Sequence, residues 1–180
     1  MSRNKLFKEL FTNIGTTGAI TFSSKPLVDK MLSFADFKGA KLLVELGGGD
    51  GSITKGIVER MDSDAKLLVF EISRNFCDNL EKMFPQENVI IICDSAENID
   101  KYLDQVKADF ILSSLPFSLI PKPIRAQIYR KSKDSVTEEG KFIQICYSYL
   151  LKYQFADYFS EIKTSFTLKN FPPAFIMICN

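Results

Sequence analysis

The sequence predicts a doubly wound α/β domain with a mostly parallel sheet. From Gly39 onward, short apolar strand-like runs alternate with amphipathic helical segments. The strand-like runs are apolar on both faces, as in a parallel sheet that helices cover on both sides. The first of them leads directly into a turn with four glycines, and such turns bind ligands in this fold class. The length of 180 residues suits one domain, so we expect a single domain over residues 1–180.

The expected elements follow one another along the chain in a regular order. Strands are predicted at 41–46, 65–72, 88–94, 108–116 and 140–149, with helices between them at 52–61, 74–84, 97–106 and 121–135. Near the C-terminus, two strand-like runs at 162–171 and 174–180 are joined by two prolines with no helix between them. The sheet should therefore have seven strands and close with an antiparallel hairpin. Residues 1–38 should form helices that precede the sheet.

Composition and charge exclude several kinds of function. The 23 Lys and Arg balance 22 Asp and Glu, and there is no basic tail or acidic block, so nucleic-acid binding through bulk positive charge is not indicated. The absence of histidine excludes a Ser-His-Asp triad, a Cys-His pair and a His-ligated zinc site, and we expect no metal. The four cysteines form no C-x-x-C pair, which indicates buried thiols in a reducing compartment.

No apolar run approaches the roughly 20 residues that a membrane-spanning helix needs, and the N-terminus lacks the apolar stretch of a signal peptide. We therefore expect a cytoplasmic protein, or one that lies on the inner face of the membrane.

The glycine turn has the order Glu45-x-Gly47-x-Gly49-x-Gly51. Glycines at the carboxyl end of a first strand let the backbone approach a ligand closely and adopt positive φ. The dinucleotide pattern G-x-G-x-x-G is not met, because Ser52 occupies its third glycine position, and no Gly-Lys-Ser/Thr follows to make a P-loop. The order E-x-G-x-G-x-G resembles motif I of the class I S-adenosylmethionine (SAM) methyltransferases. The alternative is an ordinary glycine-rich turn between a strand and a helix.

Two acids end the next two expected strands. Glu71 follows the glycines by about 20 residues, where an acidic side chain accepts both hydroxyls of a ribose. Asp94 ends the third strand, where class I methyltransferases commonly bind the adenine amine. Asp94-x-x-Glu97 is also a capping box for the following helix, and both readings stay open. Ile72 would pack on the adenine face or belong to the core.

The fourth expected strand ends in the sequence SSLPFSLIP, which begins at Ser113. Methyltransferases that act on the amines of bases have N/D-P-P-Y/F at this point, and the rRNA adenine dimethylases have N-L-P-Y. This chain keeps Pro116 and Phe117 but has Ser114 in place of the Asn or Asp that would accept a hydrogen bond from a base amine. The alternative is a loop with a packed aromatic residue.

Four segments together resemble the bacterial phospholipid N-methyltransferases, a phosphatidylethanolamine methyltransferase group related to the rRNA adenine dimethylases. They are TGAITFSSKPLVDKM, VELGGGDGSIT, SLPFSLIP and KNFPPAFIMI. The resemblance implies a Rossmann-like class I methyltransferase fold. It also implies methyl transfer from SAM to the amine of an ethanolamine headgroup, with S-adenosylhomocysteine (SAH) as product.

The resemblance also assigns roles to individual residues. The cofactor would be held by Gly18, Ala19, Ser23, Glu45, Gly47, Gly49, Gly51, Glu71, Ile72, Asp94, Ser95 and Ser113. The path of the amine would be lined by Ser114, Leu115, Pro116 and Tyr147. The Tyr147 ring would shelter a methylated ammonium by cation–π contact, or pack on the last helix instead. Because the chain has no histidine, the proton of the amine must pass to a tyrosine, a carboxylate or water.

Contact with a membrane and the choice of acceptor depend on two further observations. In residues 2–14, Leu6, Phe7, Leu10, Phe11 and Ile14 fall on one helical face, so this segment would lie in a bilayer interface or pack on the domain. One alternative function is an RNA methyltransferase of the adenine dimethylase type, which the residue at 114 and the near-zero charge disfavour. Another is a methyltransferase that acts on a small soluble amine.

Overall fold

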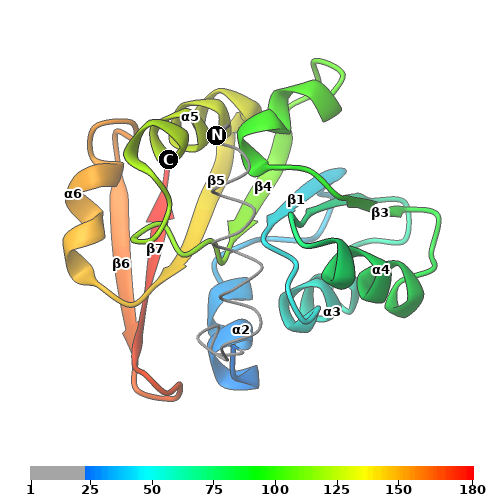
Figure 1. Cartoon of the computed structure of the whole chain (residues 1–180), viewed down its shortest axis with the longest axis horizontal. Helices are drawn as coiled ribbons and strands as arrows, with labels where there is room; N and C mark the ends of the chain where they lie inside the picture. Colours follow the sequence, from blue (N-terminus) through cyan, green and yellow to red (C-terminus); the bar gives the residue numbers. More distant parts are fainter. Residues whose placement is uncertain (1–22) are drawn as a thin grey trace.

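The computed structural model describes residues 23–180, which form a seven-stranded sheet with the strand order β3-β2-β1-β4-β5-β7-β6 (Figure 1). The strands are β1 (Leu42–Leu46), β2 (Lys66–Phe70), β3 (Val89–Ile92), β4 (Ala108–Ser113), β5 (Val136–Cys146), β6 (Ile162–Thr167) and β7 (Ala174–Cys179). Strands β1 to β5 pair in parallel, whereas β7 is antiparallel to both β5 and β6. The predicted sheet and its C-terminal antiparallel hairpin are therefore confirmed.

Helices cover both faces of this sheet (Figure 1). They are α2 (Lys25–Leu32), α3 (Ser52–Val58), α4 (Arg74–Met83), the 3-10 helix η1 (Ala96–Tyr102), α5 (Lys122–Ser135), the 3-10 turn η2 (Tyr149–Leu151) and α6 (Lys152–Phe155). Every residue of β1 is buried, and successive residues alternate between the two layers: Leu43 packs with α2, α3 and α4, and Val44 packs with η1, α5 and α6. The strands are apolar on both faces because helices cover both sides of the sheet, as expected.

Three local details differ from the sequence prediction. The segment predicted as a helix over 97–106 is the shorter 3-10 helix η1, because Asp104 and Gln105 adopt positive φ and end it. Strand β5 begins at Val136, directly after α5, and ends at Cys146 rather than at 149. Cys93 is exposed whereas the other three cysteines are buried, so the expectation of four buried thiols is wrong for this residue.

The N-terminal region is described from Ser23 onward. Helix α2 begins after Ser24, whose side chain accepts a hydrogen bond from the Leu27 N–H, a common N-terminal cap. The amphipathic segment 2–14, together with Gly18 and Ala19, lies outside the described residues. Within residues 23–180, no helix has the length and apolar character needed to cross a membrane.

The topology brings the predicted functional segments to one edge of the sheet. The parallel strands β1, β2, β4 and β5 all end at this edge. The turn between β6 and β7 lies there too, since β7 runs antiparallel to β5 and Phe175 pairs with Cys146. Ligands bind at this edge in open α/β sheets.

Candidate active site

The glycine turn begins where β1 ends and is held against the end of β2. The N–H groups of Gly47 and Gly48 both donate to the Phe70 carbonyl oxygen, at 2.8 and 3.1 Å. Gly47, Gly49 and Gly51 have φ values of +88°, +50° and +81°. A residue with a Cβ rarely adopts such values, so the E-x-G-x-G-x-G spacing places glycine where the backbone requires it.

Gly48 and Gly49 have opposite surroundings. A Cβ on Gly48 would lie 2.7 Å from the side chains of Leu80 and Val69, so this glycine allows close packing of the turn on α4 and β2. A Cβ on Gly49 would meet no atom within 4 Å. It would project into open space at the wall of a cavity, where a ligand can approach the bare backbone.

Glu71 connects the end of β2 to the glycine turn. Its Oε2 accepts from the Gly49 N–H at 3.0 Å, and its Oε1 accepts from the N–H groups of Ile72 and Ser73, both at 2.8 Å. The residue is buried, yet it lines the cavity. A carboxylate held by three backbone donors is fixed in position, and its remaining lone pairs can accept from the hydroxyls of a ribose.

Glu45 lies behind the glycine turn and lines no cavity. Its Oε2 accepts from the Thr54 hydroxyl at 2.7 Å, and its Oε1 has no partner among the described residues. Complete burial raises the pKa of this carboxyl to about 8, despite the hydrogen bond from Thr54. Glu45 therefore connects β1 to α3 through its hydrogen bond with Thr54, and it does not reach the surface of the cavity.

Asp94 follows the end of β3 by two residues, and its carboxylate accepts several hydrogen bonds. Its carboxylate accepts from the Ser95 N–H at 2.7 Å, from the Asn98 amide and from the Tyr102 hydroxyl at 2.9 Å. Partial burial acts to raise the pKa of Asp94, but these hydrogen bonds outweigh it and hold the pKa below its usual value. Asp94 is thus ionised at neutral pH and caps η1 with one part of its carboxylate.

A small second cavity of about 30 Å³ lies beside Asp94. It is lined by Gly47, Phe70, Glu71, Ile72, Asp94, Ser95, Ala96, Leu115, Ile120 and Ile128. Apolar side chains form most of its wall and Asp94 lies at its edge, which is the arrangement predicted for adenine binding.

Three hydrogen bonds from side chains connect the SLPF turn after β4 to its neighbours. The Ser114 hydroxyl donates to the Gly47 carbonyl oxygen at 2.9 Å, so it joins this turn to the glycine turn. The Gln144 amide donates to the Leu115 carbonyl oxygen at 3.0 Å, and the Arg125 guanidinium to that of Phe117 at 2.9 Å. The Phe117 ring packs on Tyr129, so the alternative of a packed aromatic residue is correct for this side chain.

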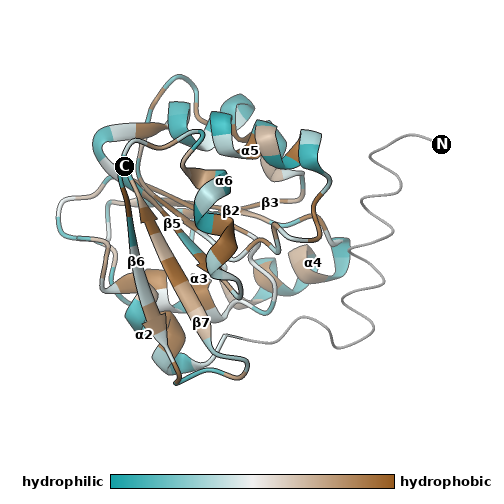
Figure 2. Cartoon of the chain, turned by 90° about the vertical axis from the view of Figure 1, so that its left-hand side faces the viewer, coloured by the Kyte–Doolittle hydropathy of each residue, from teal (hydrophilic) through white to brown (hydrophobic). Residues whose placement is uncertain are grey.

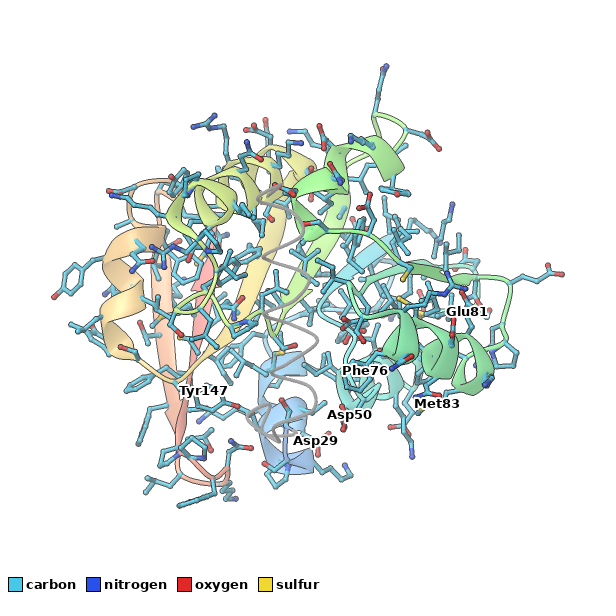
Figure 3. The ribbon with its side chains drawn as sticks, in the orientation of Figure 1. Asp29, Asp50, Phe76, Glu81, Met83 and Tyr147 are labelled. Atoms are coloured by element: carbon cyan, nitrogen blue, oxygen red, sulfur yellow. The ribbon has the colours of Figure 1, made fainter. Side chains whose placement is uncertain are left out.

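A cavity of about 480 Å³ extends from the glycine turn to the SLPF turn. Its wall comes from segments far apart in the sequence: Ser23, 47–50, Ser52, Ile53, Glu71, Ser73, Phe76, 114–119, 145–148, Leu151 and Pro172. Figure 3 shows Asp50 and Phe76 on the side of the glycine turn and Tyr147 at the end of β5. The only charged residues that residues 23–180 contribute to the walls of the two cavities are Asp50, Glu71 and Asp94. A cavity with this charge suits a cationic ligand.

The structure brings together most of the predicted site residues. The walls of the two cavities include Ser23, Gly47, Gly49, Glu71, Ile72, Asp94, Ser95, Ser114, Leu115, Pro116 and Tyr147. Three predicted residues do not line the cavities: Glu45, Gly51 and Ser113. Gly51 is the N-cap of α3 and faces α4, and Ser113 is fully buried. Sequence reasoning missed Ile53 and Phe76, because apolar residues in amphipathic helices carry no signal that separates a cavity wall from the core.

SAM requires an open backbone turn, an acidic partner for its ribose and an environment that accepts a sulfonium cation. The bare backbone at Gly49, the fixed carboxylate of Glu71 and the acidic charge of the cavity walls supply these. The residues present therefore fit this cofactor, and the strand order and glycine turn together define a class I SAM-dependent methyltransferase fold.

Comparison with known proteins agrees with this class. No protein-family model matches the sequence. An ornithine lipid N-methyltransferase of Singulisphaera acidiphila is 28% identical over 97% of this chain and 94% of its own length. A ribosomal RNA small subunit methyltransferase A of Mycoplasma capricolum is 30% identical, over 51% of this chain and 35% of its own. The resemblance to bacterial lipid N-methyltransferases is therefore confirmed over nearly the whole chain.

Solved structures share the fold at low sequence identity. The N-methyltransferase NodS of Bradyrhizobium japonicum in complex with SAH has a TM-score of 0.67 and 8% identity, over 84% of each chain. An rRNA methylase of Streptococcus thermophilus has a TM-score of 0.63 and 17% identity, over 89% of this chain and 98% of its own. The chain is a SAM-dependent N-methyltransferase with a class I fold.

Proposed function

We propose that this chain transfers a methyl group from SAM to the amine of a polar lipid headgroup. The observation that carries the proposal is the continuous cavity between the glycine turn and the SLPF turn, whose charged wall residues are all acidic within residues 23–180. A cationic or amine-bearing headgroup is attracted to such a cavity, whereas the phosphates of RNA are repelled. A relative that matches 97% of this chain over 94% of its own length is an ornithine lipid N-methyltransferase, whose name also specifies an aminolipid acceptor.

SAM supplies an activated methyl group on a sulfonium, so the protein has mainly to position the acceptor and exclude water. Gly47, Gly49 and Glu71 would hold the cofactor on the β1 and β2 side of the cavity. Leu115 and Pro116 would form the opposite wall, so that the amine and the cofactor meet between the two turns.

Ser114 is the residue that we assign to the amine. Its hydroxyl proton is used in the hydrogen bond to the Gly47 carbonyl, which leaves the oxygen lone pairs to accept from an N–H of the acceptor. Tyr147 also lines the cavity and is exposed there, so its ring can contact the methylated product ammonium. The amine must lose a proton, and Asp50 and Tyr147 are two titratable groups in the wall of the cavity that could accept it.

The test is transfer from labelled SAM to three acceptors offered separately: vesicles with phosphatidylethanolamine, vesicles with ornithine lipid, and ribosomal RNA. Label in either lipid, reduced about tenfold or more in Ser114→Ala with SAM affinity unchanged by calorimetry, supports the proposal. Ser63→Ala serves as the matched control, because Ser63 is exposed before β2, lines neither cavity and makes no side-chain hydrogen bond among the described residues. Label in RNA alone, or in neither lipid, overturns it.

A further inference from the structure

Large apolar side chains are exposed beside the mouth of the cavity. Those of η2 and α6 are Tyr149, Leu150 and Tyr153, and those of the β6–β7 hairpin are Phe166, Leu168 and Phe171. We call these six residues the hairpin face. Leu168 and Phe171 are 74% and 89% exposed, and Leu150 is 70% exposed. Isolated exposed apolar residues are ordinary, but a group of this size on neighbouring elements marks an interaction surface.

Phe175 links the two segments that carry these six residues. The Tyr149 ring lies 5.6 Å from the Phe175 ring, and the Phe166 ring lies 4.8 Å from it on the β6 side. Figure 2 shows α6, β6 and β7 together on the side of the molecule that faces the viewer. The shared contact with Phe175 therefore places η2 beside the β6–β7 hairpin.

The hairpin face adjoins the cavity at two places. Tyr147 and Ser148 line the cavity and directly precede Tyr149. Pro172 lines it as well, and it directly follows Phe171. A surface that the hairpin face contacts would therefore lie across the cavity mouth.

Lysines accompany these apolar side chains. Lys152 Nζ lies 5.8 Å from the centre of the Tyr149 ring, Lys30 Nζ donates to the Phe166 carbonyl oxygen at 2.8 Å, and Lys169 lies between Leu168 and Phe171. Among the residues that the structure describes, none of these three lysines has a carboxylate within 4.0 Å. Apolar side chains with cations among them match the interface of a bilayer that contains anionic lipids.

We infer that the hairpin face docks the protein on an anionic lipid surface and holds the cavity mouth against the headgroups. This inference deepens the proposed function, since a headgroup amine could then enter the cavity while the acyl chains stay in the bilayer. Insertion of Leu150, Leu168 and Phe171 would supply affinity through burial of apolar area. Lys152 and Lys169 would supply preference for anionic lipid.

Vesicle flotation of the full chain tests the surface independently of catalysis. Phosphatidylcholine vesicles with and without phosphatidylglycerol are compared for the wild type and for Leu168→Ser/Phe171→Ser. We expect the double variant to bind about tenfold more weakly or worse, and Lys152→Gln/Lys169→Gln to lose about fivefold per lysine on anionic vesicles alone. Val106→Ser is the apolar control and Lys66→Gln/Lys107→Gln the charge control, because these exposed residues lie at the opposite edge of the sheet.

Two further measurements separate this inference from the proposed function. SAM binding by calorimetry, and methyl transfer to lipid dispersed in detergent, should be unchanged in Leu168→Ser/Phe171→Ser, because neither residue lines the cavity. Wild-type flotation without methyl transfer to any acceptor would overturn the proposed function and leave the docking surface intact. The docking surface would be overturned if the double variant bound vesicles as strongly as the wild type. It would also be overturned if the wild type were a dimer that the double substitution converts to a monomer.

Discussion

At the scale of single residues, the Glu71 carboxylate connects the end of β2 to the glycine turn. One carboxylate accepts three backbone N–H groups, from the end of β2 and from Gly49. Glutamine would place an N–H donor against at least one of these donors, since an amide has only one acceptor oxygen. The side chain is therefore part of the fold of the site as well as a candidate cofactor ligand.

We expect Glu71→Gln to weaken SAM binding by about tenfold or more and to lower the free energy of unfolding by about 1–3 kcal/mol. Isothermal titration calorimetry measures the affinity, and urea unfolding without SAM measures the stability. Glu81→Gln is the control, because Glu81 is exposed on the outer side of α4 (Figure 3). Unchanged SAM affinity in Glu71→Gln would exclude Glu71 as a ligand of the cofactor.

Glu45 gives a prediction about pH. The pKa of its carboxyl is raised to about 8 in the folded chain, against 4.5 when it is exposed in the unfolded chain. Between these pH values the unfolded chain has released a proton that the folded chain still binds, so this group makes stability fall as pH rises. The contribution is complete below pH 4.5 and is lost as pH approaches 8.

Glu45→Gln keeps an oxygen that can accept from Thr54 and removes the ionisation. The stability of this variant relative to the wild type should therefore rise between pH 4.5 and 8, by roughly 4 kcal/mol. Urea unfolding at a series of pH values measures the difference, and Glu138→Gln, on an exposed part of β5, should show no such trend. Parallel curves for Glu45→Gln and the wild type would mean that Glu45 ionises freely in the folded chain.

At the scale of elements, two adjacent glycines of the glycine turn have different roles, one in packing and one in ligand binding. Gly48 faces Leu80 and Val69 closely, whereas Gly49 faces open space at the cavity wall. The E-x-G-x-G-x-G pattern includes Gly49 but not Gly48, so the pattern alone attributes nothing to the residue that permits the packing on α4.

Alanine at each position tests this difference. Gly48→Ala should destabilise the chain by about 1–3 kcal/mol through overpacking. Gly49→Ala should cost only about 1–2 kcal/mol, from its positive φ, but weaken SAM binding more than tenfold because the methyl group enters the ligand space. Thermal unfolding and calorimetry on both variants measure the two effects. A Gly49→Ala variant that binds SAM as tightly as the wild type would show that the ligand does not approach this backbone.

At the scale of the whole molecule, the two helical layers bury most of the sheet and leave β6, at its margin, largely unburied. Cys77, Cys146 and Cys179 are buried in these layers, and burial raises the pKa of the Cys146 and Cys179 thiols to about 12. Cys93 is exposed after β3. Thiols react as thiolates, so reactivity should follow this distribution.

We expect one thiol of the native chain to react rapidly with Ellman's reagent and four to react after unfolding in guanidinium. Cys93→Ser should remove the fast reaction, whereas Cys179→Ser should leave it. Rapid reaction of a second thiol in the native chain would show that one of the two layers opens on the time scale of the assay.

The sequence alone determined the sheet, its terminal hairpin and the residues of the two turns. Short apolar runs and period-3.6 apolar patterns depend on local geometry, so they predict strands and helices directly. The glycines at positive φ were likewise predictable, since only glycine adopts such φ values without strain. The helix over 97–106 was overestimated, because its pattern does not reveal the backbone reversal at Asp104 and Gln105.

Only the tertiary structure decided which residues meet. It placed Glu45 behind the site rather than in it, gave Ser114 a hydrogen bond to Gly47, and brought the turn of the β6–β7 hairpin to the cavity mouth. Glu45 and Thr54 are 9 positions apart in the sequence, and Ser114 and Gly47 are 67 positions apart. Local patterns carry no information about such distances, because the order of the strands in the sheet sets them.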